Sequence, residues 1–271
     1  MCRLAAYLGP AIALEQIIVA PGHSLLEQSQ HASEAKLAVN GDGFGFAWYD
    51  EAREPGLYRD VLPAWSDGNL PSLCRMIRSR LFLAHVRAST AGETSRVNCH
   101  PFTHENWSFM HNGQVPDIQR IRRPLEAMLP DDLYALRRGT TDSELIFLLL
   151  LTFGLTDDPT SAVDRVLQIL IDRSSYGIGK DAVRLTCVFS DGQSIYAFRH
   201  ASDDREPTLY VQAGEDGAWT LASEPLDGDV ARWDCIEPNV LVRLEPGKRS
   251  ETKLGTWTSV SRSGSPQKAV A

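Results

Sequence analysis

A cysteine stands second in the sequence, directly after the initiator methionine. Removal of Met1 would leave Cys2 with a free α-amine on the same residue as its thiol. The thiolate is the nucleophilic form of cysteine, and an α-amine, with a pKa of about 7.7 to 8.0, can accept the thiol proton near neutral pH. Cys2 would then supply nucleophile and base for an acyl transfer. Taken alone, a cysteine at this position usually has no function, so the rest of the chain must supply a site.

Two further motifs carry groups that suit an acyl substrate. Arg87 ends the apolar run 81–87, and its guanidinium could hold a carboxylate through two parallel hydrogen bonds. His111-Asn112-Gly113 follows a second apolar run. An asparagine amide and a nearby backbone N–H can form an oxyanion hole, and glycine permits close backbone approach. Each motif also has a plainer interpretation, a surface arginine in a loop and a tight Asn-Gly turn.

A fourth polar motif, Thr141-Asp142-Ser143-Glu144, begins the most apolar helical segment. It fits a capping box, with Thr141 as N-cap and Glu144 returning to the backbone N–H of Thr141. Asp142 lies in the first turn of this helix, where its carboxylate could face a cationic group of a substrate. The capping interpretation does not exclude that role.

Two other kinds of chemistry are disfavoured. Cys99, His100, His104 and His111 are suitable zinc ligands, but no second cysteine–histidine pair and no H-E-x-x-H motif completes a site. The glycine-rich run 41–45 lacks the Gly-Lys-Ser/Thr ending of a phosphate loop and precedes a predicted strand rather than a helix. We therefore expect no metal, no nucleotide and no other cofactor.

Composition excludes several partners. The chain has 271 residues and a formal net charge of −8, which disfavours binding to nucleic acid. Its five cysteines are odd in number and widely spread, so the default compartment is the reducing cytoplasm. The longest apolar run, 145–151, is too short to span a membrane. Gly9-Pro10 interrupts the apolar stretch near the N-terminus, which argues against a signal peptide.

Apolar and alternating runs predict strands towards both ends of the chain and helices in the middle. The expected strands cover residues 3–8, 44–49, 57–62, 81–87, 107–110, 183–190, 194–200, 208–212, 218–222, 235–236 and 240–244. The expected helices cover 14–28 in two pieces, 69–79, 125–128, 133–137, 141–153 and 162–172. We expect Gly9-Pro10 to end the first strand. This order favours an α+β fold of antiparallel sheets in one domain.

Together these motifs resemble the class II glutamine amidotransferases of the N-terminal-nucleophile hydrolase superfamily. The motifs that carry the resemblance are, in family order, Cys2 after Met1, His85-Val86-Arg87-Ala88-Ser89-Thr90-Ala91-Gly92, Asn98 with His100-Pro101, His111-Asn112-Gly113, and Thr141-Asp142-Ser143-Glu144. Segments 42–45, 65–67 and 222–226 are similar to the stand-alone branch, which includes the γ-glutamyl hydrolase of ergothioneine biosynthesis. The resemblance implies a four-layer αββα sandwich over residues 1–257. The polar composition of residues 258–271 indicates a frayed tail.

The resemblance also implies a role for each polar motif. Cys2 would attack the γ-amide carbonyl of glutamine, assisted by its own α-amine, and form a thioester. Asn112 and the Gly113 N–H would stabilise the oxyanion. Arg87 would clamp the α-carboxylate of the substrate, and Asp142 would bind its α-ammonium group.

Two more residues, Thr90 and His100, are expected to support the substrate pocket. No synthase module follows the domain, so either an ammonia-acceptor synthase acts in trans or the enzyme simply hydrolyses a γ-glutamyl amide. The substrate would be glutamine or a larger γ-glutamyl conjugate, as in the ergothioneine pathway. The alternative of another class is a catalytically silent binding or regulatory protein that retains Met1.

Overall fold

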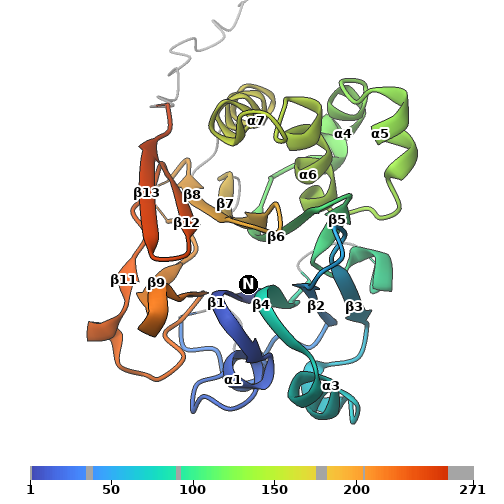
Figure 1. Cartoon of the computed structure of the whole chain (residues 1–271). Helices are drawn as coiled ribbons and strands as arrows, with labels where there is room; N and C mark the ends of the chain where they lie inside the picture. The colour runs from blue at the N-terminus through green and yellow to red at the C-terminus, as the bar shows by residue number, and fades with distance from the viewer. Residues whose placement is uncertain (1, 35–38, 90–92, 175–181, 204, 256–271) are drawn as a thin grey trace, which may run out of the picture.

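Two antiparallel β-sheets lie face to face between two layers of helices (Figure 1). The computed structural model describes residues 2–34, 39–89, 93–174, 182–203 and 205–255. This arrangement confirms the predicted α+β fold and its αββα layers. Within these ranges no helix is both long enough and apolar enough to cross a membrane.

The first sheet has seven strands in the order β11-β9-β10-β1-β4-β2-β3, so that β1 and β4 lie near its centre. Its strands are β1 (Arg3–Ala13), β2 (Phe44–Tyr49), β3 (Gly56–Asp60), β4 (Arg78–Val86), β9 (Tyr210–Ala213), β10 (Trp219–Ala222) and β11 (Asp234–Cys235). Strands from the two ends of the chain therefore share one sheet. The chain must return to β1 with β10 before this sheet is complete.

The second sheet has six strands in the order β13-β12-β8-β7-β6-β5. Its strands are β5 (Phe102–His104), β6 (Trp107–Gln114), β7 (Arg184–Ser190), β8 (Ile195–Ala201), β12 (Val240–Glu245) and β13 (Lys248–Lys253). Each registered strand pair in both sheets is antiparallel.

Helices cover the outer face of each sheet (Figure 1). The first sheet carries α1 (Glu15–Ile18), α2 (Leu25–Gln30) and α3 (Leu70–Met76); the second carries α4 (Ile118–Glu126), α5 (Asp131–Leu136), α6 (Asp142–Thr152) and α7 (Pro159–Arg173). Short 3-10 helices, η1 (Ala64–Ser66), η2 (Arg96–Asn98), η4 (Glu215–Gly217) and η5 (Val230–Arg232), lie in connecting segments. The helix α6 is apolar on all sides because it is buried between its neighbours and the second sheet.

Side-chain alternation along β1 decides which groups face the other sheet. Leu4 and Ala6 belong to the core between the two sheets, whereas Ala5 and Tyr7 belong to the core under the helices. The same period of two directs the side chain of Cys2 into the space between the sheets. The nucleophile candidate therefore starts a central strand on its inner face.

Two strands run further than the sequence pattern indicates. β1 continues through Gly9-Pro10, which we expected to end it, because its register with β4 shifts between Leu8 and Ile12. The irregular stretch accommodates Pro10, which has no N–H to donate. β6 continues through His111-Asn112-Gly113, where β7 pairs with all three residues. The Asn-Gly turn interpretation is therefore wrong.

Two strands and the start of one helix were absent from the sequence prediction. β13 carries the polar sequence KRSETK and pairs only with β12 at the sheet edge, so it has no apolar alternation to detect. β5 has three residues, too few for a periodic signal. α4 begins at Ile118 rather than at 125, because its first turn is mainly exposed and polar.

Candidate active site

Cys2 lies at the start of β1, level with the end of β4. Its Sγ accepts a hydrogen bond from the Ala88 N–H at 3.4 Å and lies 3.6 Å from the Ala88 carbonyl oxygen. Desolvation raises the pKa of the half-buried Cys2 thiol, and outweighs the Ala88 N–H and the charges of Arg3 and Arg87, which lower it. The thiol is therefore protonated at neutral pH and needs a base before it can attack.

Arg87 directly follows β4 and is buried. Its backbone N–H donates to the Gly43 carbonyl at 2.8 Å, and its carbonyl accepts from the Asp42 N–H at 3.0 Å. Its Nη1 donates to the Asp42 carbonyl at 3.3 Å and its Nη2 to the Ser89 hydroxyl at 3.0 Å. In the described part of the chain no ion pair includes this guanidinium. Its positive charge is available to a carboxylate of a ligand.

Asn112 is fully buried in β6, two residues after Met110, which belongs to the core between the sheets. Among the described residues, neither its amide oxygen nor its amide nitrogen has a hydrogen-bond partner. A Cβ on the next residue, Gly113, would lie 1.9 Å from the Arg184 carbonyl oxygen, so only glycine fits the close pairing with β7. β6 packs against β1 and β4, so the unpartnered amide faces the sheet that carries Cys2.

Asp142 is the first residue of α6, close behind the end of β6. Its Oδ2 accepts the Val115 N–H at 3.0 Å and its Oδ1 accepts the Ser143 N–H at 2.8 Å. These bonds fix the carboxylate beside the segment that leaves Gly113. Asp142 therefore starts a helix that covers the second sheet, whereas Arg87 follows a strand of the first sheet.

The capping prediction for α6 is half right. The Thr141 hydroxyl accepts the Glu144 N–H at 3.1 Å, which confirms Thr141 as N-cap. The Glu144 carboxylate does not return to Thr141; it accepts the N–H groups of Arg138 and Gly139, both at 2.8 Å. A buried carboxylate needs hydrogen-bond donors, and the loop before the helix supplies these two. The capping motif begins after this loop, so it does not reveal them.

Three buried histidines lie close to these groups. The rings of His85 and His100 are 4.1 Å apart between centroids, and the His111 Nδ1 lies 2.9 Å from the Ser143 hydroxyl. Burial lowers the pKa of all three imidazoles, that of His85 to about 3, so they are neutral at pH 7. Within the described ranges, no group of three histidine, cysteine or acidic side chains could hold a metal ion. His100 thus packs against His85, two residues before Arg87.

Among the predicted residues, Asn112 and Gly113 lie in β6, Cys2 and Arg87 flank β1 and β4, His100 precedes β5, and Asp142 begins α6. Thr90 lies outside the described residues. Sequence reasoning did not assign roles to Asp42, Ala88 and Ser89. Ala88 acts through its backbone, which leaves no signal in the sequence. Asp42 was detectable in principle, since a carboxylate in a glycine-flanked turn commonly fixes a neighbouring loop, here through the Ser89 N–H at 2.7 Å.

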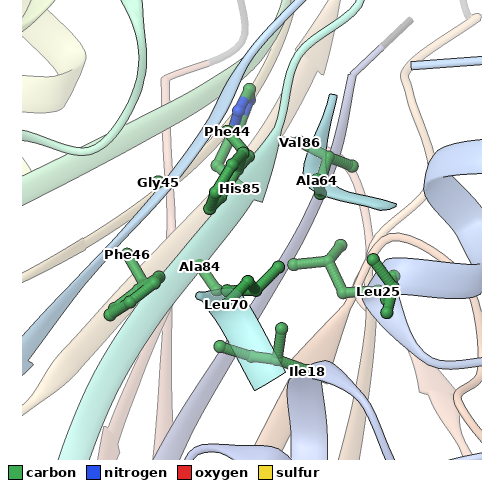
Figure 2. Close-up of a pocket in the computed structure, with 11 residues that line it drawn as sticks. Ile18, Leu25, Phe44, Gly45, Phe46, Ala64, Leu70, Ala84, His85 and Val86 are labelled. Atoms are coloured by element: carbon green, nitrogen blue, oxygen red, sulfur yellow. The ribbon is translucent and has the colours of Figure 1, made fainter. Parts of the chain in front are cut away.

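Figure 2 shows a cavity on the helix-covered face of the first sheet, lined among others by Ile18, Leu25, Leu70 and the last three residues of β4, Ala84 to Val86. Its volume is about 10 Å³, enough for a single water molecule at most. Its lining is almost entirely apolar, so it is a small packing gap rather than a substrate site.

Comparisons with known proteins identify the family to which this chain is similar. A family model described as class-II glutamine amidotransferases matches residues 24–213. The protein described as "Probable glutamine amidotransferase DUG3" from Saccharomyces cerevisiae is 39% identical, over 96% of this chain and 79% of its own length. The γ-glutamyl-hercynylcysteine sulfoxide hydrolase of Mycobacterium tuberculosis is 27% identical, over 98% of this chain and 100% of its own. A solved structure of a glutamine aminotransferase class-II domain protein from Silicibacter pomeroyi has a TM-score of 0.74 at 36% identity, covering 94% of this chain and 100% of its own.

Proposed function

We propose, from the premise that the chain belongs to the class II glutamine amidotransferases, that it cleaves the γ-amide of glutamine or of a γ-glutamyl conjugate through a thioester on Cys2. One observation carries the proposal. The Cys2 thiol contacts the N–H of Ala88, the residue that follows Arg87 in the sequence. Arg87 is buried, and its guanidinium has no acidic partner in the described chain.

The reaction needs a base next to the thiol. Burial raises the pKa of the Cys2 thiol, so the thiolate must be generated when substrate is bound. Removal of Met1 would create an α-amine on the same residue, which takes the thiol proton as Sγ bonds to the γ-carbonyl carbon. The C–N bond then breaks and the leaving amine takes that proton. Water hydrolyses the thioester and regenerates the thiol.

The oxyanion formed during attack needs donors that are already in place. The Asn112 amide is buried and lacks a protein partner among the described residues, which suits a group reserved for a transient oxyanion. The Gly113 N–H is the second donor in this proposal. Both belong to β6, and pairing with β7 holds this strand in place before charge develops.

The glutamyl head is a zwitterion, and one cation and one anion of this site can recognise it. Arg87 would hold the α-carboxylate bidentately, and Asp142 would hold the α-ammonium group. Thr90 and His100 would support this pocket. These contacts read only the glutamyl part, so they accept glutamine and a larger conjugate equally.

A larger conjugate is the second candidate for the substrate. The mycobacterial relative is named as the hydrolase of such a conjugate, and the match covers 98% of this chain and 100% of the relative. This likeness favours simple hydrolysis by one domain, residues 1–257. An acceptor synthase acting in trans is the alternative fate of the released ammonia.

The test combines the mass of the N-terminal peptide with glutamate release from a panel of amides. The panel contains glutamine, γ-glutamylcysteine and a bulkier γ-glutamyl thioether, with Cys2→Ala as the matched control. We expect a protein that lacks Met1 to release glutamate from at least one amide, and the Cys2→Ala variant to release none. A processed, folded protein that is inactive on the whole panel would reject the proposal and favour a binding role.

A further inference from the structure

A buried carboxylate lies behind the nucleophile, outside the site described above. Glu224 is 1% exposed and accepts four hydrogen bonds. The donors are the Arg3 Nη1 at 2.9 Å, the His23 Nε2 at 2.8 Å and the backbone N–H groups of Ser33 and Glu34, both at 2.9 Å. A carboxylate satisfied from so many directions has one fixed orientation.

Arg3 links this carboxylate to the nucleophile residue. It is 0% exposed, and its Nε donates to the Cys2 carbonyl oxygen at 2.7 Å. Strand alternation puts its side chain on the same face as Ala5 and Tyr7, under the helices. The guanidinium therefore lies on the far side of the sheet from the space where Arg87 and substrate would meet.

The first residues of β1 pair with β4 on one side, but on the other side β10 ends too early to reach them. The ladder between β1 and β10 stops at Ala5 and Ala222. Beyond it, the Ser223 Oγ accepts the Leu4 N–H at 3.0 Å, and the Ser223 N–H donates to the Leu4 carbonyl at 2.9 Å. Arg3, held by its own partner, then binds the next carbonyl. Ser223 and Arg3 thus bind the backbone of Leu4 and Cys2, where β10 no longer pairs with the chain.

We infer that Glu224 and Arg3 are positioning residues for Cys2, which hold its carbonyl so that thiol and α-amine face the substrate. This inference rests on the proposed function. After removal of Met1, Cys2 is the first residue, so only its carbonyl side is covalently restrained, and chain ends fray unless tied down. A misplacement of about 1 Å can cost roughly 100-fold in rate.

The first experiment measures steady-state kinetics of Glu224→Gln, with Asp227→Asn as matched control. Asp227 lies in the same loop and accepts hydrogen bonds from the Trp233 indole and the Asp229 N–H, away from Cys2. We expect kcat of Glu224→Gln to fall roughly 10- to 100-fold with KM within twofold, because substrate contacts are untouched. A kcat equal to that of the control overturns the inference.

The second experiment applies if the Glu224→Gln variant fails to fold because the buried Arg3 charge has lost its partner. The double variant Arg3→Gln/Glu224→Gln leaves no unpaired charge of this pair. We expect it to be no slower than Arg3→Gln alone, because both changes break one linkage. Multiplied losses of kcat would show that the two residues act independently, against the inference.

A third measurement does not depend on activity. Hydrogen exchange of the N-terminal peptide covering residues 2–8 should be at least several-fold faster in Glu224→Gln than in wild type, and unchanged in Asp227→Asn. Wild-type protein without turnover would reject the proposed function, and exchange alone would then decide this inference. Equal exchange in wild type and Glu224→Gln overturns it.

Discussion

The Cys2 Sγ lies 3.4 Å from the Ala88 nitrogen, so the residue after the predicted clamp Arg87 contacts the proposed nucleophile directly. Two residues 86 positions apart meet because β1 and β4 are neighbours at the centre of the first sheet. A substrate whose carboxylate binds Arg87 would therefore have its other end close to the Cys2 thiol. In the proposed function, substrate binding and thiol attack would therefore take place at the same strand end.

Arg87→Lys should weaken substrate binding more than it slows the chemical step. Lysine keeps the charge but loses the planar fork, and thus at least one charge-assisted hydrogen bond of about 1.5 kcal/mol, roughly tenfold in affinity. We expect KM to rise tenfold or more with a smaller change in kcat. Initial-rate kinetics on the preferred amide measure both, and an unchanged KM would contradict the clamp role.

Asn112→Ala should separate activity from stability. The loss of an oxyanion donor lowers kcat by roughly 100- to 1,000-fold. The free energy of unfolding should change by less than about 1 kcal/mol, since this amide has no protein partner in the described chain to lose. Urea unfolding and kinetics on the same preparation test both expectations.

The matched control for that variant is Asn98→Ala. The Asn98 Oδ1 accepts the Thr140 N–H at 2.9 Å, and its Nδ2 donates to the Glu93 carbonyl at 3.0 Å. Its removal should cost about 1 to 3 kcal/mol of stability, because buried groups lose their partners. If Asn112→Ala destabilised the protein as much as Asn98→Ala, the Asn112 amide would have a structural role instead.

The buried histidines should make stability depend on pH. In the unfolded chain they bind protons near pH 6.5, whereas burial lowers the pKa of His85 to about 3 in the folded chain. The unfolded state therefore binds more protons below pH 6.5, and stability is lost as the pH falls from there towards 3. Each such histidine contributes a slope of at most about 1.4 kcal/mol per pH unit.

His85→Leu should remove one of these titrating groups. Urea unfolding at several pH values between 5 and 7 gives the slope of the free energy of unfolding against pH, which measures the protons taken up on unfolding. Towards pH 5, wild type should take up close to one proton more than the variant. Other acidic groups cancel in this comparison because both proteins contain them. Equal slopes would mean that His85 binds its proton equally well in the folded and unfolded protein, so that burial does not lower its pKa.

Gly113→Ala should destabilise the second sheet at the oxyanion site. Its Cβ would lie 1.9 Å from the Arg184 carbonyl oxygen, so β6 and β7 must separate, at a cost of roughly 1 to 3 kcal/mol or more. Gly68→Ala is the control, because no atom lies within 4 Å of its added Cβ. Thermal unfolding should show a lower Tm for the first variant alone.

The fold was predictable because its strands and helices carry apolar patterns, and because five motifs in family order identify the layers. The predictions failed where contacts between distant segments decide the local structure. His111-Asn112-Gly113 has the composition of a turn, yet pairing with β7 keeps it extended. Polar β13 is a strand only because β12 offers it an edge.

For the candidate site, the sequence indicated residue types but not contacts. Cys2 and Arg87 lie close together, and no pattern indicated that the Ala88 N–H would contact the Cys2 thiol. The partner of Arg3 was likewise hidden. Arg3 forms a buried ion pair with Glu224, and no sequence pattern near Arg3 identifies that partner.

The ion pair between Arg3 and Glu224 joins residues 221 positions apart. The start of β1, next to the proposed nucleophile, therefore cannot reach its final place until most of the chain has been synthesised. Contacts of such long sequence separation form slowly, after the local helices and hairpins. We expect the reactive cysteine to be assembled among the last parts of the fold, so that an incomplete chain carries no working nucleophile.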